Sequence, residues 1–167
     1  MSERWKPSLT VAAIIERRIG TVSEFLLVEE HTPEGLKLNN PAGHLDPGES
    51  LQQAVVREAL EETACVFTPE RLVGVYLSRF QRPATGEDVT FIRFAFGGSA
   101  GLPDPTRRLD DGIVRTLWMT LAEVRASRER HRSPHVLGCI EDYLAGRRYP
   151  LDAITTDATV FMPEVKR

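Results

Sequence analysis

Two apolar runs near the start of the chain predict a pair of strands. Residues 9–15 are rich in β-branched side chains, and residues 25–28 form a second apolar run. The polar stretch between them, residues 16–24, contains Gly20. Short apolar runs around a polar segment with a glycine are typical of a β-hairpin. We therefore expect these two segments to pair.

A helix is predicted to begin directly after Ser50. Residues 46–48 read Asp-Pro-Gly, which is a strong turn signal. Ser50 is followed three residues later by Gln53, the S-x-x-Q spacing of a capping box that satisfies free amide donors at a helix start. We expect this helix to run to about Thr63.

The second half of the chain predicts three more strands. Residues 72–80 and 89–96 form a second hairpin, and residues 113–119 form the last strand. The segment between them, residues 97–111, is rich in glycine, proline and charge, which favours an exposed loop.

Two helices are predicted near the C-terminal end. Thr120 and Glu123 repeat the capping-box spacing before a short helix. Ser133 is predicted to cap a final helix with Pro134 at its first position, and this helix ends near Gly146. Since strands and helices alternate irregularly, we expect an α+β fold with a mixed β-sheet sandwiched between α-helices.

The composition indicates one globular domain over residues 1–167. Hydrophobic side chains make up 41% of the chain and charged ones 27%, which is typical of a folded protein. A chain of this length buries roughly 70% of its unfolded surface, enough for a core without a metal or disulfide. A metal, if present, is therefore expected to be catalytic. The place of the tail after about residue 151 stays open.

Charge and cysteine usage exclude several classes of partner. The chain carries 21 lysine and arginine residues against 24 aspartate and glutamate residues, a net charge of −3, so we expect no nucleic-acid polymer as a partner. Cys65 and Cys139 lie far apart, which indicates free thiols in a reducing compartment. The first apolar run is broken at Glu16, so we expect no signal peptide, no membrane contact and a cytoplasmic location.

Three carboxylates share one face of the helix predicted after Ser50. Glu58, Glu61 and Glu62 lie three and four positions apart, a spacing at which like charges repel. Glu61 and Glu62 also fall in the last turn, where the helix dipole favours cations. One interpretation is an acidic stripe that faces water. The other is a platform for Mg²⁺, or Mn²⁺ in its place, because Mg²⁺ prefers carboxylate oxygens and commonly bridges substrate phosphates.

The same helix carries a sequence motif. Gly43 is followed after five residues by Glu49, and after seven more by residues 57–65, which read Arg-Glu-Ala-Leu-Glu-Glu-Thr-Ala-Cys. This run resembles the Nudix box of pyrophosphohydrolases, G-x5-E-x7-R-E-U-x-E-E-x-G-U, where U is a bulky aliphatic residue. Ala59 and Cys65 replace aliphatic residues of the box, and Ala64 replaces its last glycine. If position 64 needs a left-handed backbone, alanine costs roughly 1 kcal/mol there.

Further segments resemble a group of bacterial Nudix phosphatases, the NudJ group. They are residues 6–12, 27–30, 41–45, 93–94 and 147–151. Leu38 departs from this group, which often carries tryptophan there. The resemblance implies a Nudix-like mixed sheet between helices and activity on nucleoside di- and triphosphates or on the pyrimidine diphosphate precursor of thiamine.

The resemblance also implies roles for the residues of the box. Glu58, Glu61 and Glu62 are expected to hold the metal together with the backbone carbonyl of Ala42. The catalytic candidates are Glu58 and the pair that orients the carboxylates, Arg57 and Glu49.

The sequence leaves more than one candidate for the base that activates water. It is either Glu58 or an acidic residue of the loop before the last strand, Asp110 or Asp111. Two aspartates that simply face solvent in this loop are the alternative.

Substrate-binding candidates lie mainly on the second hairpin. Arginine can bind phosphate with two hydrogen bonds, which makes candidates of Arg79, Arg82 and Arg93. His44 and Asp111 are further candidates. The alternative for each is a surface side chain without a role. Tyr76 and Phe80 either stack on a base or belong to the core.

We expect metal-dependent hydrolysis of phosphoanhydride bonds in nucleoside tri- or diphosphates, or in a related small diphosphate, with release of phosphate. Cleavage of ADP-ribose or dinucleoside polyphosphates is the alternative within enzymes. A non-catalytic nucleotide-binding module is the alternative outside them, although every acidic residue of the box is present. The oligomeric state, monomer or homodimer, stays open.

Overall fold

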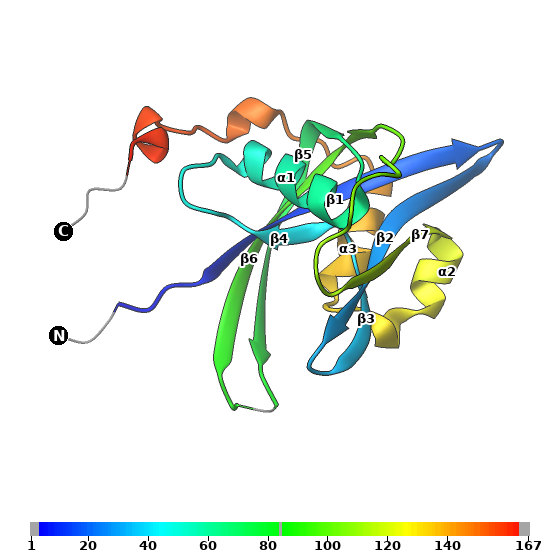
Figure 1. Ribbon diagram of the computed structural model, residues 1–167, viewed down its shortest axis with the longest axis horizontal. Helices are drawn as coiled ribbons and strands as arrows, with labels where there is room; N and C mark the ends of the chain where they lie inside the picture. The colour runs from blue at the N-terminus through cyan, green and yellow to red at the C-terminus, as the bar shows by residue number, and fades with distance from the viewer. Residues whose placement is uncertain (1–3, 84, 164–167) are drawn as a thin grey trace.

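The computed structural model describes residues 4–83 and 85–163 and shows a seven-stranded mixed sheet (Figure 1). Five strands follow the order β3-β2-β1-β6-β5, while β4 pairs with β1 and β7 with β2. Only the β1 and β6 pair is parallel among these pairings, which makes the sheet mixed. The strands are β1 (Ser8–Ile19), β2 (Val22–Thr32), β3 (Gly35–Asn39), β4 (Ala42–His44), β5 (Phe67–Gln81), β6 (Asp88–Ala100) and β7 (Ile113–Thr120).

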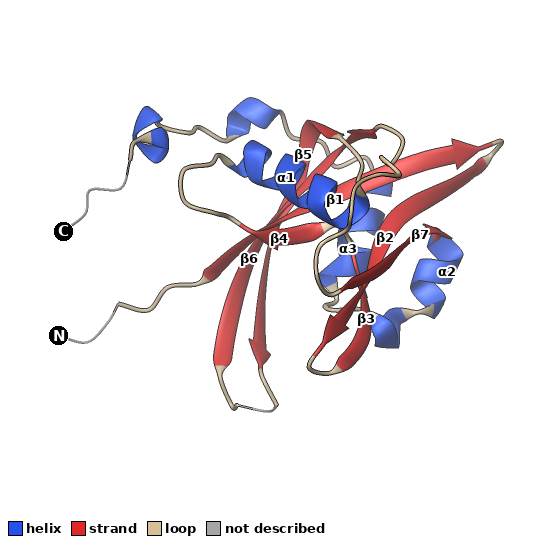
Figure 2. Ribbon diagram, in the orientation of Figure 1, coloured by secondary structure: helices blue, strands red, loops and turns tan. Residues whose placement is uncertain are grey.

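Helices cover both faces of the sheet (Figure 2). Helix α1 (Leu51–Thr63) buries Val55 against Val11 and Phe96 on one face. Helices α2 (Leu121–Ala126) and α3 (His135–Leu144) pack Val124 and Ile140 on the other face. The predicted α+β fold with a sheet between helices is confirmed. No helix of the described residues is long and apolar enough to cross a bilayer.

The long strand β1 joins two parts of the sheet. Its first eight residues, from Ser8 to Ile15, pair with β6, and those from Glu16 to Ile19 pair with β2. The short strand β4 pairs with β1 as well and leads the chain toward α1. Residues 11–15 are all buried because helices cover both sides of this strand. The predicted first hairpin is confirmed.

The predicted loop over residues 97–111 was wrong at its start. Strand β6 continues to Ala100, and Gly97 and Gly98 are paired within it. A β-carbon at position 98 would lie 2.0 Å from the Thr68 carbonyl oxygen of β5. The glycines therefore allow close approach of two strands, whereas the sequence pattern suggested a turn.

The predicted cap of the last helix was also wrong. Helix α3 begins at His135 with Pro134 as its cap residue, and no side chain caps it. The Ser133 hydroxyl is buried without a hydrogen-bond partner among the described residues.

The tail beyond α3 packs against the domain. The backbones of Tyr149 and Leu72 exchange two hydrogen bonds of 2.9 Å. Leu151 and Ile154 pack on the apolar cluster under α1, and the Gln52 side chain of α1 donates to the Leu151 carbonyl at 3.5 Å. Short 3-10 turns at Arg128–Arg130, Leu151–Ala153 and Ala158–Phe161 complete the described fold.

Candidate active site

Helix α1 begins and ends as its sequence predicts. The Ser50 hydroxyl accepts from the Gln53 N–H at 3.2 Å, and the Gln53 side chain accepts from the Ser50 N–H at 2.8 Å. Ala64 ends the helix in a left-handed conformation, with φ 59° and ψ 14°, and its N–H reaches the Leu60 carbonyl at 2.9 Å. It is the only described residue other than glycine with positive φ. Ala64 therefore occupies a left-handed position, and the motif has glycine at this position.

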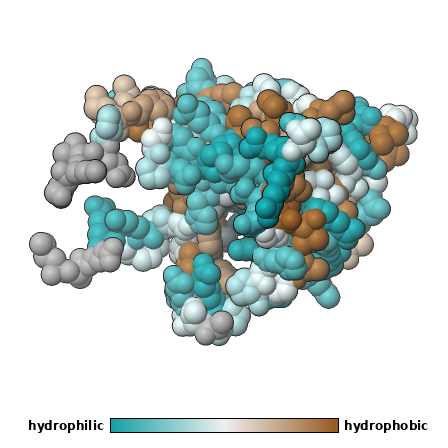
Figure 3. All heavy atoms as spheres, viewed as in Figure 1, coloured by the Kyte–Doolittle hydropathy of each residue, from teal (hydrophilic) through white to brown (hydrophobic). Residues whose placement is uncertain are grey.

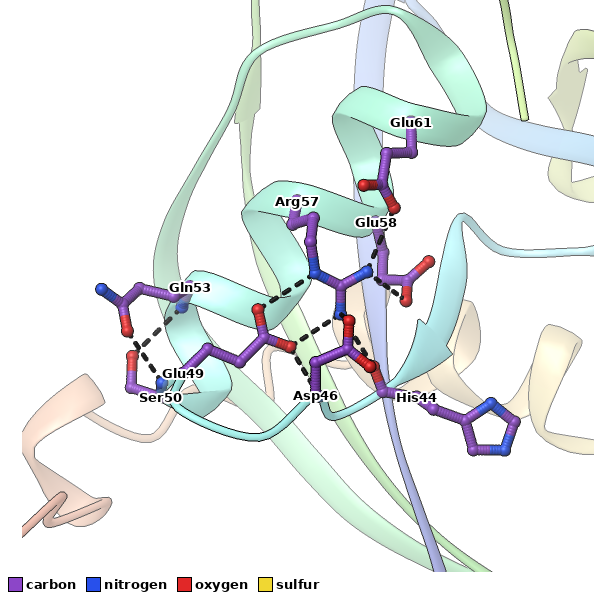
Figure 4. Close-up of polar contacts among 8 residues, drawn as sticks. All are labelled: His44, Asp46, Glu49, Ser50, Gln53, Arg57, Glu58 and Glu61. Atoms are coloured by element: carbon purple, nitrogen blue, oxygen red, sulfur yellow. Dashed lines mark hydrogen bonds and ion pairs between the residues drawn. The ribbon is translucent and has the colours of Figure 1, made fainter. Parts of the chain in front are cut away.

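Arg57 connects the acidic residues around α1 (Figure 4). Its Nε donates to Glu49 at 3.0 Å and its Nη2 to the same carboxylate at 2.6 Å. Nη1 donates to Glu58 at 2.8 Å and to Glu61 at 3.1 Å, while Nη2 also reaches the His44 carbonyl at 2.9 Å. This planar fork fixes the carboxylates in a way that a lysine cannot reproduce. The predicted pair of Arg57 and Glu49 is present.

Glu58 lies directly over the backbone of Gly43. A β-carbon at position 43 would be 2.1 Å from the Glu58 carboxyl carbon. Glycine is therefore needed here for space rather than for a special backbone angle.

Glu62 turns toward β4 instead of toward Arg57. Its carboxylate accepts from the Ala42 N–H at 2.9 Å. The preceding carbonyl, of Pro41, accepts from Ala13 of β1 at 2.8 Å. Since peptide groups alternate along a strand, the N–H and carbonyl of Ala42 face away from β1, toward α1. This orientation supports the Ala42 carbonyl as a candidate ligand.

The carboxylates of the cluster differ in their proton affinity. Burial raises the pKa of Glu62 to about 8; the Ala42 N–H opposes this, and the charges of Glu30, Glu58 and Asp110 reinforce it. Burial also raises the pKa of Glu58, despite its bond to Arg57.

Glu49 behaves in the opposite way. Burial works against ionisation of this carboxyl, but the hydrogen bonds from Arg57 and from the Asp46 N–H outweigh it and lower its pKa. The Glu49 hydrogen bond in turn raises the pKa of Arg57. Glu49 and Arg57 thus form a fixed ion pair, whereas burial dominates the pKa of Glu58 and of Glu62.

This arrangement fits a divalent cation. Two buried carboxylates with raised pKa values, Glu58 and Glu62, face a strand whose Ala42 carbonyl points to the same side, and all are hard oxygen donors. In residues 4–83 and 85–163, no three acidic, histidine or cysteine side chains already converge as metal ligands. Glu58 and Glu61 are bound to Arg57 instead.

The loop before β7 brings one predicted aspartate to the site. The Asp110 N–H donates to the Glu61 carbonyl at 3.0 Å, and the Asp110 charge contributes to the raised pKa of Glu58 and Glu62. Asp111 is exposed and pairs with Arg108 at 2.9 Å.

The structure does not bring the other hairpin candidates to α1. Arg79 is exposed and pairs with Asp88, and Arg82 pairs with Glu87 at 3.1 Å. The exposed His44 ring lies 6.4 Å from that of Phe91.

The remaining hairpin candidates are one exposed aromatic residue and two side chains whose partners lie outside α1. Phe80 is exposed, while Tyr76 donates to Asp142 at 2.8 Å beneath α3. Arg93 is buried against two asparagines.

Sequence reasoning missed three polar residues beside the carboxylates. Glu30 lies near the end of β2, Asn39 ends β3 and Asn40 follows it. The Glu30 charge contributes to the raised pKa of Glu62. The only local signal was that the two asparagines directly follow the apolar Leu38, which does not distinguish them from ordinary turn residues.

The surroundings of α1 are mainly hydrophilic on the face shown in Figure 3.

Known proteins share this fold and motif. The family model of the NUDIX domain matches residues 6–137. Phosphatase NudJ from Escherichia coli K12 is 32% identical over 150 residues, which cover 90% of this chain and 92% of that protein. A NUDIX hydrolase from Nitrosomonas europaea has a TM-score of 0.80 and 49% identity, covering 91% of this chain and 98% of that one. The MutT protein from Methanosarcina mazei Go1, with a TM-score of 0.66 and 22% identity, covers 87% and 100% and shares the fold. The chain belongs to the Nudix hydrolase family.

Proposed function

We propose that this hydrolase uses Mg²⁺, or Mn²⁺ in its place, to release phosphate from nucleoside tri- or diphosphates or from a related small diphosphate. The observation that carries the proposal is the cluster formed by Arg57, Glu49, Glu58 and Glu61, with Glu62 beside it. The identity to a protein named a phosphatase supports phosphate as the product.

The chain's own residues have distinct tasks in this proposal. Glu58, Glu61, Glu62 and the Ala42 carbonyl would hold the cation, which when bound neutralises phosphate charge and lowers the pKa of a water molecule. The Glu49 and Arg57 pair keeps two of the carboxylates in place.

Two carboxylates are candidates to accept the proton of the attacking water. Glu58 lies over Gly43, and Asp110 is close enough to contribute to its raised pKa. We favour these two over Asp111, because Asp111 faces solvent and binds Arg108.

A product analysis tests the proposed reaction. The protein is incubated with a panel of nucleoside di- and triphosphates, ADP-ribose and a dinucleoside polyphosphate in ¹⁸O-labelled water, with Mg²⁺ or with excess EDTA. We expect labelled orthophosphate from the open-ended substrates and no turnover in EDTA. Label confined to a nucleoside monophosphate would contradict terminal attack and favour the pyrophosphohydrolase alternative. Binding without turnover of any substrate would indicate a nucleotide-binding module.

We also infer that the protein works in the cytoplasm on small molecules, without nucleic-acid polymers or membranes as partners. Its cysteines, Cys65 and Cys139, are free and buried, which suits a reducing compartment. Fractionation of the native cells checks this location.

A further inference from the structure

Arg93 is a buried cation in the middle of the sheet. It lies on β6, paired with Thr10 of β1 and with Tyr76 of β5, and its exposed fraction is 8%. Its Nη1 donates to the Asn40 side-chain oxygen at 3.2 Å and its Nη2 to the Asn39 side-chain oxygen at 3.1 Å. Both terminal nitrogens of the guanidinium group therefore donate to side-chain amides.

Burial of the Arg93 charge lowers the free energy of unfolding. Among the described residues Arg93 forms no ion pair within 4.0 Å, and burial of an unpaired charge is strongly unfavourable. The buried Cys139 thiol of α3 lies near it, and the negative charges of Glu30 and Glu62 act on it from farther away. Two amide oxygens replace only part of its lost hydration.

The two asparagines join Arg93 to other parts of the fold. The Asn39 amide donates to Glu30 of β2 at 3.2 Å, and the Asn40 amide donates to the Val136 carbonyl of α3 at 3.4 Å. Both donors are thereby directed away from the guanidinium, which leaves the amide oxygens for Arg93. The orientation of each amide is fixed from two sides.

The segment that these contacts hold leads straight to the carboxylates. Asn39 ends β3, and Pro41 follows Asn40 with its carbonyl bound to Ala13. The next residue is Ala42, whose N–H holds Glu62. Only Pro41 thus separates Asn40, which contacts Arg93, from Ala42, which contacts Glu62.

We propose that Arg93 is a positioning residue, which acts through Asn39 and Asn40 to hold the Ala42 peptide and the Glu62 carboxylate in place. It does so without contacting the substrate phosphate. This inference rests on the proposed metal-dependent hydrolysis for its catalytic consequence, but the structural effect on Ala42 does not depend on turnover.

Amide hydrogen exchange in the metal-free protein tests the structural step. Lysine in Arg93→Lys keeps the charge but cannot bind both amides as a fork. We expect the Ala42 N–H to exchange at least about tenfold faster, while buried amides away from β4, such as that of Leu27 on β2, change by less than about threefold. Arg125→Lys, at an exposed ion pair with Glu141, is the matched control and leaves Ala42 unchanged. Unchanged exchange at Ala42, or equally faster exchange throughout the core, would overturn the proposal.

Metal binding and kinetics test its consequence. Free Mn²⁺ measured by electron paramagnetic resonance should show at least about fivefold weaker binding to Arg93→Lys. For the substrate that the wild type hydrolyses, kcat should fall at least about tenfold and KM should change by less than about threefold. A tenfold rise in KM with normal Ala42 exchange would show that Arg93 contacts substrate and would overturn the proposal.

A second variant keeps the test decisive if Arg93→Lys fails to fold. Asn40→Ala removes one of the two amide contacts and should show the same pattern at Ala42 and in Mn²⁺ binding. Unaltered values in this variant would contradict the proposal. A wild type that binds Mn²⁺ but hydrolyses no substrate would refute the proposed function alone, since the exchange result needs no turnover.

Discussion

Glu58 lies so close to Gly43 that a β-carbon at position 43 would be 2.1 Å from its carboxyl carbon. The first residue of the motif and its central glutamate therefore share one small space. The Arg57 side chain joins the same loop to the helix, because it donates to both the His44 carbonyl and the Glu58 carboxylate. Loop and helix hold each other in register through these contacts.

This close approach predicts the effect of Gly43→Ala. The added methyl group must push the Glu58 carboxylate aside, and we expect turnover to fall at least about a hundredfold, which corresponds to roughly 3 kcal/mol in the barrier. Gly138→Ala on α3 is the control, because a β-carbon there meets nothing within 4 Å. Steady-state kinetics of both variants check this. Near-normal turnover of Gly43→Ala would contradict the assigned role of Glu58.

Loss of a single carboxylate should disable the site without unfolding the protein. We expect Glu61→Gln and Glu62→Gln to lower turnover at least about a hundredfold, while circular dichroism stays native. Glu141→Gln, at an exposed ion pair on α3, should keep full activity. If both site variants retained normal turnover, the cation would be held elsewhere.

The stability of the metal-free protein should fall as pH rises. The pKa of Glu62 is about 8 in the folded protein against an ordinary value of 4.5 for a glutamate in water, so the folded state binds more protons between these values. Stability is therefore lost progressively from about pH 4.5 and fully above pH 8, by at least ~1 kcal/mol. Thermal unfolding at pH 5 and pH 8 measures this. Glu62→Gln should flatten the dependence, and an equal slope in that variant would argue against Glu62 as its source.

Ala64→Gly should stabilise the fold. Alanine at φ 59° carries a steric cost that glycine avoids, so we expect a gain of about 0.5–1 kcal/mol in the free energy of unfolding. Ala122→Gly within the exposed turn of α2 should instead destabilise the protein by a similar amount. Chemical denaturation distinguishes the two, and a loss of stability in Ala64→Gly would show that the buried methyl group matters more than the backbone angle.

Local signals allowed much of α1 and its charged face to be predicted. The capping box, the left-handed end and the Arg57 and Glu49 pair all depend on residues close in sequence. Strand pairing of β1 with β2 follows from the same kind of pattern.

Long-range contacts explain what the sequence did not reveal. Arg93 meets Asn40 and Asn39 across 53 and 54 positions, and only the order of strands in the sheet brings them together. The pairing of Gly98 with Pro69, which places Gly98 against the Thr68 carbonyl, likewise depends on the neighbouring strand. Arg79 and Arg93 look alike in sequence, yet one faces solvent and the other is buried.

The two backbone hydrogen bonds between Tyr149 and Leu72 bear on how much of the chain is needed for folding. The family model ends at residue 137, but a chain cut there would lose Ile140 and most of α3, and so uncover the apolar cluster behind the sheet. A cut after Gly146 would keep α3 yet remove the Tyr149 bridge and the two side chains, Leu151 and Ile154, that pack under α1. We therefore expect the shortest fragment that folds by itself to extend at least to Ile154, because the tail is part of the scaffold on which α1 rests.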